Sequence, residues 1–257
     1  MTINENDGLY ETAVTQILNQ HTTVRSFTDK AVPDEMLHAA LNAARRSPTS
    51  SNMQTYSIIV VRNAEMKKKL AVLAGNQKHV EQCDVFVGFL ADISRLATVG
   101  GMHDLPLHKS LETTVIATVD AALVGMSVQT AVESFGLGAV MVGGMRNQPQ
   151  AVADLLGFPA GVYMVFGMSI GWPADDTVQT NFKPRLPEAL VIHHEQYDQT
   201  DPQPLIEQYD AALADYYGQQ NRNQHTAAWS GPIAKRFTSP ARPDLRQTLE
   251  GMGFQFD

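Results

Sequence analysis

Six residues of this sequence have side chains suited to binding an anion, and they lie in two clusters. Four stand close together near the N-terminus and two are separated by one proline in the last third of the chain: His21, Thr22, Thr23, Arg25, Lys183 and Arg185. A phosphate monoester carries up to two negative charges and is bound by cations, hydroxyls and free backbone amides. The clusters therefore indicate a phosphate site, and the alternative is that they are solvated surface.

Two further segments, at residues 49–54 and 76–79, are rich in hydroxyl and amide side chains. These groups donate and accept hydrogen bonds, so the segments have what is needed to bind the edges of a flat heterocycle. The alternative is that both are solvated loops.

A pair of glycines follows a short apolar run that predicts a buried strand at 139–142. Gly143 and Gly144 have no side chains, so a ligand can approach the backbone closely there. In open α/β sheets, crevices at strand ends hold ligands. The turn therefore indicates a binding site, although a tight turn beside a core strand has the same pattern.

No familiar catalytic motif accompanies these residues. The sequence lacks a nucleophile elbow, a Walker loop, a His-Glu-x-x-His pair and a dinucleotide fingerprint, since the glycines at 136 and 138 follow a helix and not a strand. His103 and His108 have neither the spacing nor the acidic partners of a metal site, so no metal is expected.

The elements that must position these residues alternate along the chain. Strands are expected at 57–61, 85–90, 139–142 and 163–171, and helices at 10–19, 33–46, 64–74, 111–135 and 149–156. Such alternation indicates a layered core of sheet and helices. After residue 180, a short strand at 190–192 and helices near 205–217, 229–237 and 244–252 are expected to extend that core.

The helix at 111–135 is expected to be buried all round, because apolar and small residues lie on nearly every side of it. Its acidic residues Glu112, Asp120 and Glu133 would then need partners. Before this helix, residues 100–108 are expected to form a flexible loop. The lysines at 67–69 are expected to be a solvated helix face.

Composition excludes several classes of protein. The net charge of -8 and the pI of about 5.4 argue against nucleic-acid binding and against a polybasic membrane anchor. Polar residues interrupt the long helix, so no membrane span is expected. Cys83 is the one cysteine, which excludes an internal disulfide and fits a reducing, cytoplasmic location. We expect this cysteine to be a small buried apolar residue.

Seven segments, in this order and spacing, form a recognisable pattern. They are His21-Thr-Thr-Val-Arg25-Ser-Phe27, Ser50-Ser-Asn-Met-Gln54, Gly75-Asn-Gln-Lys-His-Val80, Glu133-Ser-Phe-Gly-Leu-Gly138, Val142-Gly-Gly-Met-Arg-Asn147, Phe166-Gly-Met-Ser-Ile-Gly-Trp-Pro173 and Lys183-Pro-Arg-Leu-Pro187. Over nearly the whole chain, this pattern resembles the oxygen-insensitive nitroreductase and NAD(P)H–flavin oxidoreductase family, in particular its larger branch with a C-terminal extension.

The resemblance implies an α+β three-layer sandwich, in which helices flank a central, mostly antiparallel sheet. Residues 1–257 would form a single domain, with about 180–257 as a helical extension wrapping the core. The protein would be a homodimer with one FMN per subunit at the subunit interface. The helix at 111–135 would then be the central dimer helix, and this would account for its all-round apolar character.

The resemblance also assigns site residues. The FMN phosphate and ribityl end would be held by His21, Thr22, Thr23, Lys183 and Arg185. The pyrimidine edge of the flavin would face Arg25 and Gln77. The ring would be lined by Met141, Val142, Gly143 and Gly144, with a glycine N–H directed at N5. The partner subunit would close the other edge with Thr49, Ser50, Ser51 and Gln54. Arg25 and Glu112 would be the catalytic residues.

The implied function is reduction of flat acceptors by an FMN enzyme that takes electrons from NADPH or NADH. Nitroaromatics, quinones, azo compounds and free flavin would be reduced by two-electron, ping-pong transfer. The alternative is a flavin-binding or flavin-delivering protein with little turnover. A third alternative, a structural or interaction dimer without cofactor, does not explain the retained cations and glycines.

The sequence departs from the family at the residues expected to contact the nicotinamide nucleotide. Relatives that select NADPH have arginines where this chain has Gln220 and His225, and Arg222 is the arginine that remains nearby. A 2′-phosphate is bound best by guanidinium groups. We therefore expect a weakened preference for NADPH, with use of NADH. A second departure is Thr22, which replaces an arginine of most relatives.

Overall fold

The computed structural model describes residues 2–3, 10–174, 182–220 and 226–257. The chain divides into two compact units, Met1–Val178 with Asp244–Asp257, and Gln179–Pro243. Each unit is described by itself below. The expectation of a single domain over 1–257 remains a prediction.

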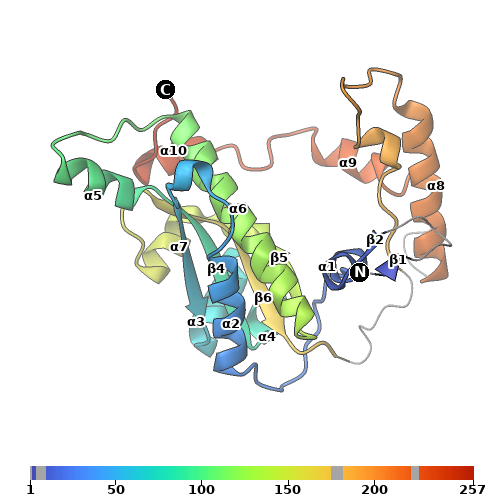
Figure 1. Cartoon of the computed structure of the whole chain (residues 1–257), viewed down its shortest axis with the longest axis horizontal. Helices are drawn as coiled ribbons and strands as arrows, with labels where there is room; N and C mark the ends of the chain where they lie inside the picture. Colours follow the sequence, from blue (N-terminus) through green and yellow to red (C-terminus); the bar gives the residue numbers. More distant parts are fainter. Residues whose placement is uncertain (1, 4–9, 175–181, 221–225) are drawn as a thin grey trace. The chain divides into compact units, whose positions relative to one another are not determined.

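The first unit is built on a four-stranded sheet in the order β3-β4-β6-β5 (Figure 1). Its strands are β3 (Tyr56–Val61), β4 (Val85–Asp92), β5 (Gly138–Val142) and β6 (Val162–Gly171). All three pairings are antiparallel. The predicted α+β class with a mostly antiparallel sheet is confirmed. A separate two-stranded ribbon joins β1 (Thr2–Ile3) and β2 (Tyr10–Glu11).

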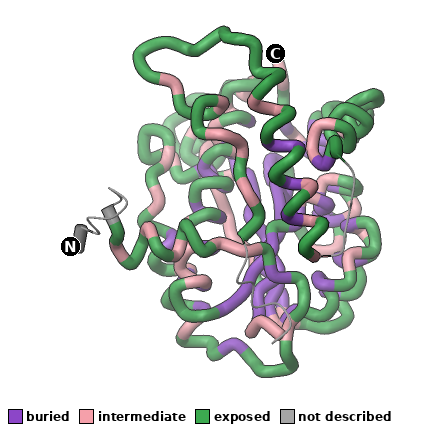
Figure 2. Tube along the Cα trace, turned by 90° about the vertical axis from the view of Figure 1, so that its right-hand side faces the viewer, coloured by how far each residue is buried: buried purple, intermediate pink, exposed green. Residues whose placement is uncertain are grey.

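Both faces of the sheet are apolar, and alternate residues of β4 divide between them. Val87 and Phe89 face a core that includes α2 (Asp34–Ala44) and α6 (Leu111–Ser134). Phe86 and Leu90 face a second core. The second core is covered by α3 (Ala64–Leu73), α4 (Lys78–Gln82) and α7 (Pro149–Leu156). The resulting helix–sheet–helix layers leave the central strands buried (Figure 2).

The long helix α6 is buried on one side only. A capping box between Ser110 and Thr113 starts it, and Gly136, with φ of +80°, follows its last turn. The expectation of all-round burial is wrong for the single chain, because a stripe of large apolar residues is 39% to 54% exposed: Leu111, Val115, Val119, Leu123 and Met126. Among the described residues, α6 is the one helix long and apolar enough to cross a membrane, a test that core helices of soluble proteins also pass.

Other local expectations are wrong as well. Residues Ser94–Met102 form helix α5, so the loop expected at 100–108 begins only after it. The segment expected as a loop at 76–79 runs into α4, and Glu188–Leu190 is a 3-10 turn where a strand was expected at 190–192. Lys67 is not solvated: it is buried and donates to the carbonyl oxygens of Cys83 and Asp84. Its ammonium group satisfies backbone acceptors that precede β4.

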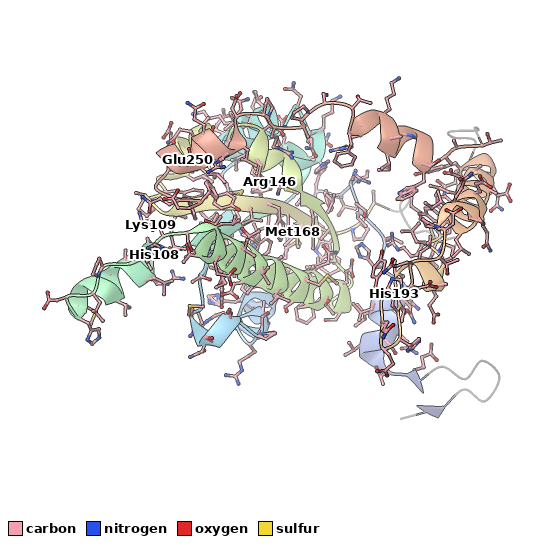
Figure 3. The ribbon with its side chains drawn as sticks, turned by 90° about the horizontal axis from the view of Figure 1, so that it is seen from above. His108, Lys109, Arg146, Met168, His193 and Glu250 are labelled. Atoms are coloured by element: carbon pink, nitrogen blue, oxygen red, sulfur yellow. The ribbon has the colours of Figure 1, made fainter. Side chains whose placement is uncertain are left out.

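The C-terminal segment returns to the first unit. Helix α10 (Leu245–Gly251) lies against α7, and the Lys109 ammonium donates to the Gly253 carbonyl at 2.8 Å. Figure 3 shows Lys109 and Glu250 at the same end of this unit. The chain end is thereby fixed next to the start of α6. The N-terminal helix α1 (Ala13–Asn19) contacts α6 too.

The second unit is helical where it is described. It contains α8 (Gln203–Gln219) and α9 (Ser230–Arg236), and Asp210 of α8 accepts hydrogen bonds from the backbone amides of Trp229 and Ser230. A small cluster of apolar side chains forms its core: Tyr209, Leu213, Tyr216 and Ala228.

Candidate functional site

The anion-binding cluster near the N-terminus lies along the edge strand β5. Thr23 forms a parallel bridge with Ala139, and the Val24 amide donates to the Ala139 carbonyl at 3.1 Å. The approach is close enough to require a glycine in β5, since a Cβ on Gly138 would lie 2.7 Å from the Val24 side chain. Because the two segments run in the same direction, Arg25 follows β5 toward its glycine turn.

His21 is held by an acidic residue of α6. Its Nδ1 lies 2.6 Å from Oε1 of Glu133, and Gln129 Nε2 donates to the same oxygen at 2.5 Å. Gln129 is buried and the side chain of Glu133 is 12% exposed. An N–H on Nδ1 that donates to the carboxylate fixes the plane of the ring.

The second carboxylate oxygen of Glu133 is different. Oε2 is buried, and no described residue makes a hydrogen bond to it. A buried carboxylate oxygen without a donor is costly, because it loses water and gains nothing in return. The structure therefore has an acceptor beside His21 that is ready for a donor such as a hydroxyl.

The glycine turn after β5 forms a notch in the backbone. Gly143–Asn147 is a 3-10 turn, and a Cβ on Gly144 would lie 2.5 Å from the Ala74 carbonyl oxygen and from Gln77 Nε2. A Cβ on Gly143 would meet nothing closer than Nη2 of Arg146, at 3.6 Å. Gly144 is thus required by packing, whereas Gly143 faces a space bounded by a guanidinium.

Arg146 forms one side of this notch. Its Nη1 donates to the carbonyl oxygen of Val165, so the guanidinium is held against β6 (Figure 3). On β5, Val142 is buried and Met141 is 42% exposed. The apolar Met141 and the bare turn together offer a surface on which a flat ring can stack.

Gln77 lies at the notch and Arg25 is close to its neighbour His79. Burial, followed by the positive charge of Arg25, lowers the pKa of His79. The Arg25 side chain is exposed, as expected for a group that meets a ligand. Three predicted groups, the 21–25 segment, Gln77 and the glycine turn, are therefore brought to one end of the sheet.

The loop at 49–54 has an unusual backbone and is anchored by a buried acid. Ser51, Asn52 and Gln54 all have positive φ, between 46° and 56°. Asp120 of α6 is fully buried and accepts from the Ser50 amide at 3.0 Å, and from the Thr55 amide at 3.0 Å and hydroxyl at 2.8 Å. The carboxylate thus holds both ends of a strained loop.

The loop and Glu112 do not belong to the same end of α6 as His21. At about 1.5 Å of rise per residue, Asp120 lies about 20 Å from Glu133 along the helix axis, and Glu112 lies about 32 Å from it. Glu112 is exposed in the first turn. Within one chain, the 49–54 loop and Glu112 therefore lie away from the end of α6 that holds His21.

The remaining predicted residues are in the second unit. Lys183 Nζ lies 5.2 Å from the centre of the Tyr217 ring, and the Tyr209 hydroxyl donates to the Pro184 carbonyl at 3.1 Å. Burial raises the pKa of Tyr209, against the opposing charges of Arg185 and Lys183. The two cations therefore lie close to one another. Arg222 lies outside the described residues.

Sequence reasoning gave no role to His79, Ser169 or Asp120. The signal for Asp120 was present, since an acid within an apolar helix needs partners, but the partners come from a distant loop. His79 was quoted within a motif, and its contact with Ser169 spans 90 residues of sequence. Only the folded strands bring these polar groups together.

The family model "Nitroreductase family" matches residues 18–172, and "Nitroreductase family, C-terminal domain" matches residues 183–257. The oxygen-insensitive NADPH nitroreductase of Salmonella typhimurium is 37% identical over 93% of this chain and 97% of its own length. An NAD(P)H FMN reductase of Bacillus subtilis is 34% identical over 95% of this chain and 98% of its own length.

Solved structures of related proteins also match the chain over nearly its whole length. NfrA2 of B. megaterium has a TM-score of 0.91 at 35% identity, covering 96% of this chain and 100% of that protein. The NADPH:FMN oxidoreductase of Vibrio harveyi, solved with NAD+, has a TM-score of 0.85 at 31% identity, covering 95% of this chain and 99% of that protein.

Proposed function

The chain belongs to the nitroreductase family, and on that premise we propose that it is an FMN-dependent NAD(P)H oxidoreductase. The observation that carries the proposal is the glycine notch after β5, with Gln77 at its wall and the Arg25 segment beside it. A notch of bare backbone next to a cation fits a flat, electron-accepting ring better than it fits a compact substrate.

Two further features fit FMN. A Cβ at Gly143 would meet nothing closer than 3.6 Å, so the space beside this backbone is open for a ring to approach. Oε2 of Glu133 is a buried acceptor in need of a donor, and the ribityl chain of FMN carries hydroxyls. These features support a ring at the turn and a sugar chain directed toward His21.

When bound, FMN accepts two electrons from a nicotinamide and passes them to a second substrate. The chain's own groups bind and polarise the cofactor. We assign Arg25 and Gln77 to the pyrimidine edge, where a positive charge and an N–H stabilise developing negative charge. Met141 and Val142 would line the ring, and a backbone N–H of Gly143 or Gly144 would be directed at N5.

The phosphate end is assigned to the anion-binding clusters. His21 presents its Nε2 on the side of the ring away from Glu133, while Thr22 and Thr23 offer hydroxyls. Lys183 and Arg185 are assigned to the same phosphate from the sequence resemblance. Loss of the relatives' arginine at Thr22 is expected to weaken this end of the site.

We also propose a homodimer with the cofactor at the subunit interface. The exposed apolar stripe runs from Leu111 to Met126, about two thirds of the 24 residues of α6, and is the self-complementary kind of surface that a two-fold dimer uses. If two such helices cross in opposite directions, the start of one lies near the end of the other. In such a dimer we assign the partner's 49–54 loop and Glu112 to the cofactor site of the first chain, as the sequence resemblance implies.

The acceptors proposed are small flat aromatics: nitroaromatics, quinones, azo compounds or free flavin, reduced in a ping-pong cycle. The test is a visible spectrum of the purified protein, followed by anaerobic titration. We expect a yellow protein that bleaches with NADH or NADPH and regains colour with a quinone. A yellow protein that no nicotinamide bleaches would be a flavin carrier, and a colourless protein after FMN reconstitution would refute the proposal.

For the reductant, we propose a weakened preference for NADPH. The motivating observation is the pair Gln220 and His225 at positions where NADPH-selective relatives have arginines. Comparable or better kcat/KM with NADH would agree with this. A strong preference for NADPH that Arg222→Ala abolishes would contradict it.

A further inference from the structure

A hydrogen-bonded chain of polar side chains runs behind the notch, and the proposed function uses only its last member, Gln77. It joins Ser169 of β6, His79 of α4 and Gln77. Ser169 and His79 are 0% and 8% exposed. The Ser169 hydroxyl lies 3.2 Å from His79 Nδ1, and His79 Nε2 lies 2.9 Å from Gln77 Oε1. Gln77 Nε2 donates to the Ala74 carbonyl at 2.9 Å.

The Ala74 carbonyl determines the direction of every bond in this chain. A carbonyl oxygen can only accept, so the Gln77 amide must present its NH2 group to it, with Oε1 toward His79. His79 therefore carries its proton on Nε2 and donates to Oε1. Its Nδ1 is then an acceptor, and the Ser169 hydroxyl donates to it. Rotating the Gln77 amide by 180° would place two acceptor oxygens against each other.

Crowding at Gly144 removes other positions for this amide. Gln77 Nε2 and the Ala74 oxygen both lie 2.5 Å from where a Gly144 Cβ would be, so these atoms pack directly on the turn. Gly75 and Asn76, with φ of 90° and 60°, form the tight bend that brings the amide back to residue 74. One of the two Nε2 hydrogens is used by Ala74, and the other remains for a ligand.

We propose that His79 is a positioning residue: it holds the Gln77 amide so that its second N–H donates to a carbonyl or ring nitrogen of the flavin's pyrimidine edge. The proposal rests on the proposed function, because it deepens the role of a residue at that site. It assigns to Ser169 the part of fixing the tautomer of His79.

The surroundings of His79 favour its neutral form. The imidazole is buried, and the charged group that faces it is Arg25. Cys83 lies next to Ser169, and burial raises the pKa of the Cys83 thiol, so this neighbour is neutral as well. A neutral imidazole has one donor and one acceptor, which is the combination that the chain from Ser169 to Gln77 needs.

The test is a double-mutant cycle on flavin binding and flavin potential. The variants are His79→Leu, His79→Gln, Gln77→Ala and the double variant Gln77→Ala/His79→Leu. Each is measured for the dissociation constant of FMN by flavin fluorescence and for the midpoint potential of the bound flavin. His79→Gln is the matched variant, because its terminal amide can reach the Nε2 position and donate to Gln77.

His79→Leu is expected to weaken FMN binding about fivefold to tenfold and to lower the potential, as loss of one hydrogen bond would. His79→Gln is expected to restore most of both. In the Gln77→Ala background, the His79→Leu effect is expected to disappear. If His79→Leu is as harmful in that background as in the wild type, His79 does not act through Gln77 and the proposal is wrong.

If the His79→Leu variant does not fold, Ser169→Ala takes its place in the double-mutant cycle. It removes only the donor to Nδ1, and a weakening of FMN binding of about twofold is expected, again absent in the Gln77→Ala background. No change on Ser169→Ala, or an equal change with and without Gln77, contradicts the proposal. Failure of the wild type to bind FMN would instead refute the proposed function, so the two failures are distinguishable.

Discussion

The pair formed by His21 and Glu133 shows how one side chain prepares another for a ligand. The carboxylate takes the Nδ1 side of the imidazole at 2.6 Å, which leaves Nε2 to face an anion. If both ring nitrogens donate, one to Glu133 and one to phosphate, the site pairs two anions across one imidazole. Gln129 supports the same oxygen from one turn back along α6.

Glu133→Gln tests this arrangement. The neutral amide is a weaker acceptor for His21 than the carboxylate is. We expect the dissociation constant of FMN to rise about tenfold, as loss of a charge-assisted hydrogen bond would cause. Riboflavin, which lacks the phosphate but keeps the ribityl hydroxyls, serves as the control and should lose less affinity than FMN. An equal loss for riboflavin would show that Glu133 acts through the ribityl chain, the ring or the fold and not through the phosphate.

Two anchors set the position of the loop between α2 and β3. Asp120 of α6 accepts hydrogen bonds from the backbone amides at the two ends of the loop. Arg95 of α5 donates to the carbonyl oxygens of Gln54 and Tyr56. Arg95 is itself held by Asp92 at 2.9 Å. The loop therefore depends on elements up to 70 residues away, which explains how three left-handed residues persist there.

Asp92→Asn tests the second anchor through its pH dependence. Burial alone would raise the pKa of Asp92, but hydrogen bonds from Ser57 and Ser94 and the charge of Arg95 outweigh it and lower the pKa. Because the pKa of Asp92 is lower in the folded state than in the unfolded state, its charged form stabilises the fold at pH above the unfolded-state pKa. This stabilisation is lost as the pH falls through the folded-state pKa. We expect Asp92→Asn to cost about 1 to 3 kcal/mol of unfolding free energy at pH 7.

Urea denaturation at neutral pH and near about pH 3 measures this difference. The gap between wild type and Asp92→Asn should narrow at the lower pH, because the unfolded wild-type chain then binds a proton at Asp92 that folding must release. A gap that is the same at both values would mean that Asp92 stabilises the fold by packing alone.

Sequence patterns predicted the elements better than the contacts between them. The four strands of the main sheet and α7 were predicted almost to the residue, because apolar runs bounded by glycine and proline define them locally. Helix α5 was missed because Gly100 and Gly101 lie in its last turn, where they weaken helix propensity. Lys67 was wrongly predicted to be solvated, because the carbonyl groups that it contacts, those of Cys83 and Asp84, lie 16 and 17 residues further along the chain.

The candidate site shows the same difference between what residue type predicts and what only the folded contacts show. His21, Arg25, Gln77 and the glycine turn were assigned from residue type and family resemblance, and the fold brings their segments together. The polar chain through His79 could not be predicted, because no local pattern states which strand residue will face a helix residue. The exposed face of α6 could not be told from a buried one either, since both are apolar.

At the scale of the whole molecule, the α6 stripe predicts the oligomeric state. Val119→Lys places a charge in the middle of the stripe, where Val119 is 49% exposed in one chain. We expect this variant to elute as a monomer and to lose FMN, because burying an unpaired ammonium in an interface is costly. Val72→Lys, at an equally exposed position of α3, is the matched control and should remain dimeric. A dimeric, yellow Val119→Lys protein would place the interface elsewhere.

Whether each site takes residues from both chains can be decided by mixing two damaged proteins. Arg25→Ala removes a cation from one half of the proposed site. Ser51→Val puts a β-branched residue at φ of 46°, which strains the exposed 49–54 loop of the other half. Each homodimer should have both of its sites damaged. In a heterodimer, both lesions fall in one site, and the second site is intact.

Random mixing makes about half of the dimers heterodimers, each with one intact site of two, so about a quarter of wild-type activity should return. The activity should appear only after the chains have exchanged, since separately purified homodimers mixed without exchange contain no intact site. If exchange restores nothing, the loop and the cation act within one chain.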